Sequence, residues 1–142
     1  MAEYRSLAQL RYLIRHFLQE GDETARKAGL EPQQYLMLLT IRGLPAGERP
    51  TVRTLAERLA LRHHSAVELI DRLAMHGLVK RSRDLEDRRQ VQVALTAKGE
   101  KILERVVEQS ISELRTTGLD LVAAIGELLG VGKGSRFKSS RV

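Results

Sequence analysis

The sequence of 142 residues contains no cysteine, which excludes disulfide bonds and thiolate chemistry. It also lacks any apolar run of about 18 residues, the length that a membrane-spanning helix requires. The first residues do not resemble a secretory signal, because Arg11 and Arg15 interrupt the apolar stretch that such a signal needs. We therefore expect a soluble protein of the cytoplasm that makes no contact with a membrane.

Groupings of side chains typical of metal sites and active sites are missing as well. The four histidines, His16, His63, His64 and His76, include no pair spaced four residues apart, and there is no cysteine to complete a soft metal site. Surface or DNA-facing histidines are the simpler interpretation. No Ser-His-Asp or Cys-His grouping is recognisable, so we expect neither an enzyme nor a cofactor.

The formal net charge of +6 is weak support for nucleic-acid binding, because of where the charges lie. Four of the cations fall in the segment 132–142, and the chain without this segment has a net charge of +2. This segment is rich in Gly, Ser, Lys and Arg, and we expect it to be a disordered basic tail. The placement of the charges is more informative than their sum.

Apolar residues recur at helical spacing along most of the chain and predict a mainly α-helical domain, 1–131, with about six helices. The first pattern covers Glu3–Gln19, and Gly21 is expected to end or interrupt this helix. The next helix is expected to begin at Pro32, with Gln34 reaching back to the preceding cap, and to stop near Gly43.

Two short helices, Thr51–Ala60 and His63–Met75, are expected next, with Thr51 capping the first of them. Gly77 is expected to close the second helix in a left-handed conformation. The alternating apolar residues of 78–95 then predict a two-stranded hairpin. This order, covering 51–96, is that of a winged helix-turn-helix, in which the second helix enters a groove of DNA and the hairpin forms the wing.

A long helix is expected after Thr96, which can cap it, with a break at Gly118 and a short helix up to residue 130. The last helix has only Asp120 and Glu127 as charged residues, so its apolar surface needs a partner. We expect segments 3–20 and 97–130 to supply the interface of a homodimer.

The hairpin tip carries the most informative charge pattern. Residues 80–89 contain five cations and three acids, and a cationic ribbon suits the minor groove of DNA. A solvated hairpin with surface ion pairs is the alternative. The polar start of the second helix and nearby cations complete the expected contacts with double-stranded DNA, which are Thr51, Arg53, Arg62, His63, His64, Ser65, Arg72, Arg81, Arg83, Arg88 and Arg89.

A combination of short motifs resembles the MarR family of bacterial transcriptional regulators. It consists of Leu55-Ala56, Asp71-Arg72-Leu73, Gly77-Leu78-Val79, Arg81, the stretch 84–89, Leu95-Thr96 and Gly99. The resemblance is strongest from Thr51 to Gly99 and implies a homodimeric winged helix-turn-helix whose first and last helices interlock. It also implies that Arg89 enters the minor groove and that Asp87 supports it. Some similar regulators sense zinc, so metal binding stays an alternative to this interpretation.

The function expected from this resemblance is that of a repressor, or less often an activator, which binds a pseudo-palindromic operator as a homodimer and is released by an effector. Candidates for binding a small aromatic or anionic effector are Tyr12, Arg15, His16 and Tyr35, which ordinary interface positions would also explain. The alternative is a winged-helix protein–protein interaction module without specific DNA binding.

Overall fold

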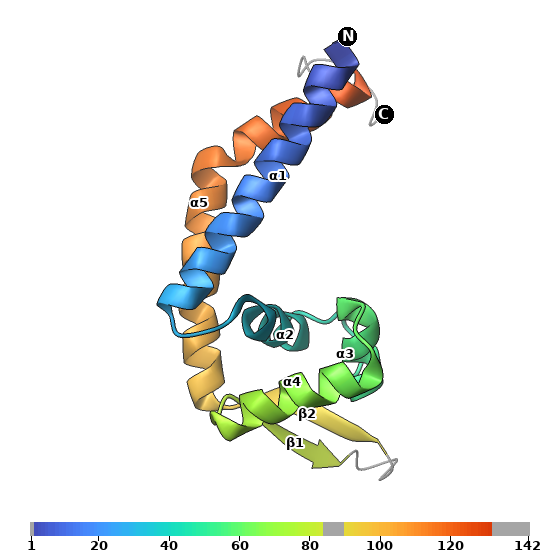
Figure 1. Ribbon diagram of the computed structural model, residues 1–142, viewed down its shortest axis with the longest axis vertical. Coiled ribbons are helices and arrows are strands. Elements are labelled where there is room, and N and C mark those ends of the chain that lie inside the picture. Colours follow the sequence, from blue (N-terminus) through green and yellow to red (C-terminus); the bar gives the residue numbers. More distant parts are fainter. Residues whose placement is uncertain (1, 84–89, 132–142) are drawn as a thin grey trace. The chain divides into compact units, whose positions relative to one another are not determined.

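The computed structural model describes residues 2–83 and 90–131, which form two compact units (Figure 1). We call residues 25–107 the winged lobe, and the described residues of Met1–Thr24 and Glu108–Val142 the helical arm. Helices α1 (Ala2–Lys27) and α5 (Ala97–Leu129) contribute to both units. Among the described residues, no helix is both long enough and apolar enough to cross a membrane.

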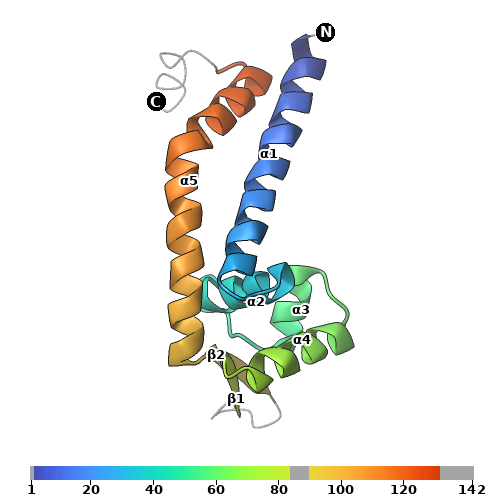
Figure 2. The ribbon, with the colours of Figure 1, turned by 60° about the vertical axis from the view of Figure 1, so that its left-hand side comes forward.

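Along the chain, the end of α1 and the start of α5 enclose the three helices and the two-stranded antiparallel sheet of the winged lobe. These elements are α2 (Pro32–Arg42), α3 (Val52–Leu59), α4 (His63–Met75), β1 (Val79–Arg83) and β2 (Val91–Leu95). In the sheet, Val79 lies opposite Leu95 and Arg83 opposite Val91. Helix α4 lies alongside the hairpin (Figures 1 and 2). The predicted fold class, mainly α with a small β-hairpin wing, is therefore confirmed.

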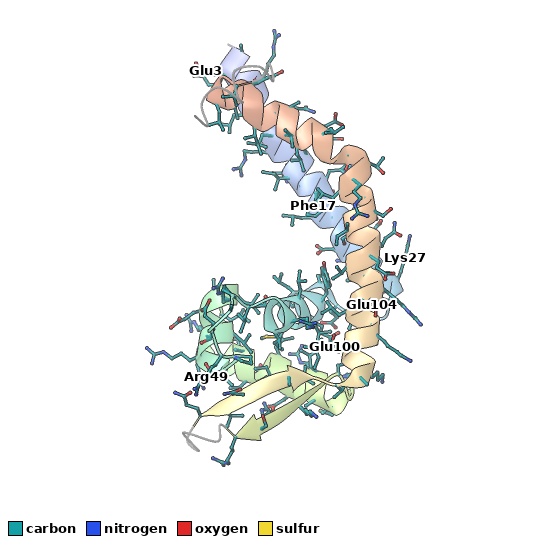
Figure 3. The ribbon with its side chains drawn as sticks, turned by 180° about the vertical axis from the view of Figure 1, so that it is seen from behind. Glu3, Phe17, Lys27, Arg49, Glu100 and Glu104 are labelled. Carbon is teal, nitrogen blue, oxygen red and sulfur yellow. The ribbon has the colours of Figure 1, made fainter. Side chains whose placement is uncertain are left out.

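Apolar side chains from every helix and both strands meet in one core of the winged lobe. The largest fully buried side chains are Met37, Leu38, Leu55, Ile70, Leu73, Val93 and Val106. At the rim of this core, Arg42 Nε at the end of α2 lies 3.2 Å from Glu100 Oε1. Glu100 is on α5 and is labelled in Figure 3. This core fixes the orientation of α3 and α4, because each helix buries one apolar stripe in it.

The beginnings of α2 and α3 follow the local signals in the sequence. Pro32 occupies the first turn of α2, and the Glu31 backbone N–H donates to Gln34 Oε1 at 2.9 Å. The Thr54 backbone N–H donates to Thr51 Oγ1 at 3.2 Å. Both predicted caps are confirmed, and each satisfies amides that the helix itself leaves unpaired.

Two predicted helix ends are wrong. Helix α1 continues through Gly21 to Lys27, and α5 continues through Gly118 to Leu129, so the described residues contain five helices rather than about six. A helical glycine costs about 1 kcal/mol relative to alanine, which the hydrogen bonds of the surrounding long helix can offset, since each further helical residue adds one bond. The hydroxyls of Thr116 and Thr117 donate to carbonyl oxygens one turn earlier, a bond that bends helices, and α5 changes direction near there (Figure 1).

The helical arm has almost no core of its own. Among its described residues, Ala124 is the only buried hydrophobic side chain. Its exposed large hydrophobic residues are Tyr4, Leu7, Tyr12, Ile14, Leu18, Ile111, Leu114, Leu119, Val122, Ile125 and Leu129. Within the arm, α1 and α5 contact each other through polar groups such as Ser6 Oγ, which donates to Glu127 Oε2 at 3.0 Å.

Candidate nucleic-acid interface

A tight turn joins α3 to α4. Ala60 closes α3 in the left-handed region, with φ of 54° and ψ of 41°, and the Leu61 backbone N–H donates to the Ala56 carbonyl at 2.9 Å. This arrangement satisfies the last free carbonyls of α3 and reverses the chain within a few residues. Helix α4 therefore begins at His63, directly beside the end of α3.

Helix α4 presents a dry face to the core and a polar face to solvent. As predicted, Ala66, Leu69, Ile70 and Leu73 are buried. His63, His64, Glu68 and Arg72 are exposed, while Ser65 is half-buried. Arg62 at the N-cap makes no capping bond with its side chain, so among the described residues the first amides of α4 have no side-chain cap from their own N-cap residue. Amides in this position readily donate to a phosphate oxygen.

Three of the residues predicted to contact DNA meet around one hollow. Thr51, Arg53 and His63 line this hollow of about 340 Å³ together with Gln90 and the start of β2. The exposed Arg53 guanidinium lies 3.5 Å from the Glu57 carboxylate one turn along α3. The beginnings of α3, α4 and β2 therefore converge on one surface of the winged lobe.

Backbone contacts join the helix-turn-helix to the hairpin. Thr51 forms an isolated antiparallel bridge with Gln92, and the Val93 backbone N–H donates to the Pro50 carbonyl at 2.9 Å. The segment before α3 thus pairs with β2 near the start of that strand, toward the tip of the hairpin. These contacts hold the first half of β2 at a fixed position relative to α3.

An ion pair joins the wing to α4. Arg81 Nη2 on β1 lies 2.5 Å from Asp71 Oδ1 on α4, so the Arg81 side chain faces α4. A direct contact between Arg81 and DNA stays a prediction. Asp71 was not predicted as a site residue, although it is part of one of the motifs that carry the family resemblance.

Of the remaining predicted wing residues, only Arg83 is among the residues that the structure describes. Arg83 lies on β1 and is exposed. Arg88, Arg89 and Asp87 lie outside the described residues, so their roles stay predictions.

The predicted effector residues do not form one group. Tyr12 and His16 are in edge-to-face contact, with ring centroids 6.0 Å apart, and both line a hollow of about 230 Å³ in the helical arm. Arg15 lines a different hollow, of about 220 Å³, with Arg11 and apolar residues of α1. Tyr35 is half-buried and packs against the core of the winged lobe. The structure therefore brings together two of the four residues.

One carboxylate that was not predicted as a site residue, that of Glu20, lies beside Tyr12 and His16, and a second, that of Glu113, contacts Glu20. Glu20 Oε1 lies 2.9 Å from His16 Nδ1, and Glu20 lines the same hollow. A hydrogen bond with Glu113, partial loss of water and the Glu113 charge raise the pKa of Glu20 above its ordinary value, while His16 opposes this shift. No local pattern predicts the contact between these carboxylates, because Glu113 comes from α5.

Comparisons with known proteins agree with this geometry. Residues 28–90 match the family model described as "MarR family". The chain is 30% identical over 106 residues to YsmB of Bacillus subtilis, described as an uncharacterized HTH-type transcriptional regulator, and the alignment covers 75% of this chain and 70% of that relative.

Solved structures share the fold. A MarR family protein from Bacillus stearothermophilus has a TM-score of 0.67 and 26% identity, with 99% of this chain and 86% of that chain covered. A mutant of MepR from S. aureus, solved bound to an oligodeoxyribonucleotide, has a TM-score of 0.65 at 18% identity, with 93% of this chain and 94% of that chain covered.

Proposed function

This chain belongs to the MarR family of DNA-binding transcriptional regulators, and on that premise we propose that it is a repressor that binds a pseudo-palindromic operator as a homodimer. The half-sites would lie about one helical turn, roughly 10 base pairs, apart. A small-molecule effector would release the repressor from its operator by changing the spacing between the α4 helices of the two protomers.

The observation that best supports DNA binding is the convergence of Thr51, Arg53 and His63 around one hollow. In this proposal the start of α4 enters the major groove, where His63 and His64 approach base edges and the free amides approach a phosphate. Arg53 and Arg72 contact phosphates, a role in which positive charge helps at any base sequence.

The wing completes the proposed contacts. Arg89 would enter the minor groove with Asp87 as its support, and the Asp71–Arg81 ion pair would hold the wing against α4. A narrow minor groove has an enhanced negative potential, which attracts an inserted guanidinium.

The helical arm supports the homodimer. Many of its large apolar side chains are exposed on both α1 and α5, and extensive exposed apolar surface marks an interaction site. A second copy presents the same surface, so a twofold pairing would bury both. Twofold symmetry then matches a pseudo-palindromic operator.

Fluorescence anisotropy with labelled duplexes from the DNA upstream of the gene tests this function. Replacing Arg53, His63 or Arg89 with alanine should in each case cost about 1–3 kcal/mol of binding free energy. Arg105→Ala is the matched control, because Arg105 is an exposed cation of the winged lobe on α5 and does not line the hollow. Full affinity in folded Arg53→Ala and Arg89→Ala variants would contradict the assignment of the interface.

Salt dependence separates this function from a protein–protein interaction module. Binding that neutralises several phosphates weakens steeply as salt concentration rises, because counterions are released from the DNA. A shallow salt response, or the absence of binding to upstream DNA, would favour the interaction module instead.

A further inference from the structure

The hollow in the helical arm combines an apolar wall with acidic groups. Tyr12 and Phe17 of α1 and Leu121 of α5 supply apolar surface, and Figure 3 labels Phe17 on α1. Glu20 from α1 and Asp120 from α5 supply the charges. Of the described residues that line this hollow, none is a lysine or an arginine.

A third carboxylate increases the negative charge beside the hollow. Glu113 of α5 is in contact with Glu20, and its Oε1 accepts a hydrogen bond from Gln109 Nε2 at 3.1 Å. Its other oxygen, Oε2, is buried and accepts no hydrogen bond from an amide, amine or hydroxyl donor among the described residues. Carboxylates in contact are stable only when a proton or a nearby cation offsets their repulsion.

The chemistry of the lining distinguishes between ligand classes. A protonated amine donates up to three hydrogen bonds to carboxylates, and its charge is also attracted to the face of a tyrosine ring. An anion would meet the carboxylates of Glu20 and Asp120, and the basic side chain in the described lining, His16, already contacts Glu20. Arg15, the cation that the sequence suggested for an anionic effector, lines a different hollow.

We propose that this hollow binds a small organic cation, a protonated amine on an aromatic or apolar body, with Glu20 and Asp120 accepting from the amine and Tyr12 and Phe17 against the body. The proposal rests on the proposed function in one respect, since it gives a chemical class to the effector. A hollow of about 230 Å³ suits a ligand with a single ring.

Three probes of similar shape and different charge test the ligand class. Isothermal titration calorimetry with the full chain at pH 7.5 would compare 2-phenylethylamine, 2-phenylethanol and 3-phenylpropanoate. We expect saturable binding of the amine, binding of the alcohol at least about ten times weaker, and no saturable binding of the carboxylate. Carboxylate binding as tight as amine binding, or no amine binding, would overturn the proposal.

Variants locate the site. Glu20→Gln and Asp120→Asn should each weaken amine binding about tenfold while leaving alcohol binding unchanged, a selectivity that mere loss of structure would not produce. Glu104→Gln is the matched control, because Glu104 is an exposed acid of α5 that does not line the hollow. If Glu20→Gln and Asp120→Asn bind the amine as tightly as Glu104→Gln does, the amine binds elsewhere and the proposal is overturned.

The pH profile adds an independent readout. The groups that face Glu20 are His16 and Glu23 on α1 and Glu113 on α5, with Asp120 across the hollow. The amine favours ionised Glu20, whose pKa is raised chiefly by its hydrogen bond with Glu113. Amine affinity should therefore fall as pH decreases through this raised pKa, and Glu20→Gln should flatten that fall. A wild-type profile as flat as that of Glu20→Gln would contradict the role of Glu20.

DNA binding is measured separately, so the two proposals can fail independently. If 2-phenylethylamine binds and lowers DNA affinity, both the ligand class and the effector role are supported. If it binds without changing DNA affinity, the ligand class stands and release by an effector fails. If DNA binds and the amine does not, the ligand class alone is wrong.

Discussion

A single hydroxyl group, that of Thr96, connects the end of α4 to the start of α5. Thr96 Oγ1 donates to the Gly77 carbonyl at 2.6 Å and accepts from the Gly99 backbone N–H at 3.1 Å. The Thr96 backbone N–H also donates to the Leu78 carbonyl at 3.0 Å. This connection requires glycine at positions 77 and 99, for different physical reasons. Gly77 has φ of +71° with open space around it, whereas Gly99 lies against the Leu78 backbone.

Alanine substitutions at Gly77 and Gly99 should differ in cost. A Cβ at position 99 would lie 2.1 Å from the Leu78 carbonyl oxygen, so the backbone must shift. We expect Gly99→Ala to lower the free energy of unfolding by about 3 kcal/mol, the upper end for overpacking. Gly77→Ala should cost about 1 kcal/mol, the conformational penalty of a left-handed alanine. Urea denaturation measures both, and a larger loss for Gly77→Ala would contradict these roles of the two glycines.

At the scale of elements, the ion pair between β1 and α4 separates two roles for Arg81. If Arg81 only contacts DNA, removing the acid Asp71 should raise DNA affinity, because a negative charge near phosphate is removed. If the pair orients the wing, removing either partner should weaken binding. The partly exposed pair should contribute only about 0–1 kcal/mol to stability, so folding is preserved.

We expect Asp71→Ala and Arg81→Ala each to weaken DNA binding about tenfold, and the double variant to weaken it no further. This lack of additivity is the mark of residues that act through one contact. Glu68→Ala is the control, since Glu68 is an exposed acid on the same helix and its removal should leave affinity unchanged or higher. Anisotropy titrations measure these affinities, and a gain of affinity in Asp71→Ala together with a loss in Arg81→Ala would assign Arg81 to DNA alone.

The bounds of elements could be predicted from the sequence where the signal is local. Thr51 and Gln34 form the expected capping bonds, α4 spans the predicted residues, and Gly77 has the expected positive φ. The predicted ends at Gly21 and Gly118 are wrong, because one helical glycine costs less than the surrounding helix contributes. Propensity indicates a weak point in a helix and does not decide whether the helix ends there.

At the scale of the whole molecule, the sequence predicts which segments contribute to the site better than it predicts which residues meet. Periodicity indicated the polar face of α4, whereas the Asp71–Arg81 pair depends on how β1 lies against α4. The contact between Glu20 and Glu113 depends on the pairing of two helices from opposite ends of the chain. Such contacts are not encoded in local patterns, so the charge of the hollow could not be predicted.

The helical arm yields the last prediction, which concerns assembly. Leu119 and Val122 are 76% and 65% exposed, so glutamates there remove no buried contact within the single chain. We expect the wild type to sediment as a dimer, at twice the 16.0 kDa of the chain, and Leu119→Glu with Val122→Glu to sediment as a folded monomer. Burying uncompensated charges in a dimer interface is strongly unfavourable.

The control for assembly is Leu36→Glu, which places the same charge on the exposed apolar surface of α2 in the winged lobe, where Leu36 is 48% exposed. This variant should remain dimeric if the arm alone forms the interface. Because two linked half-sites are bound more tightly than one, the monomeric variant should also lose operator affinity, while each lobe keeps its weak affinity for a half-site. Analytical ultracentrifugation and anisotropy together test this coupling. A monomeric wild type that binds the whole operator tightly would show that the exposed apolar residues of α1 and α5 serve another partner.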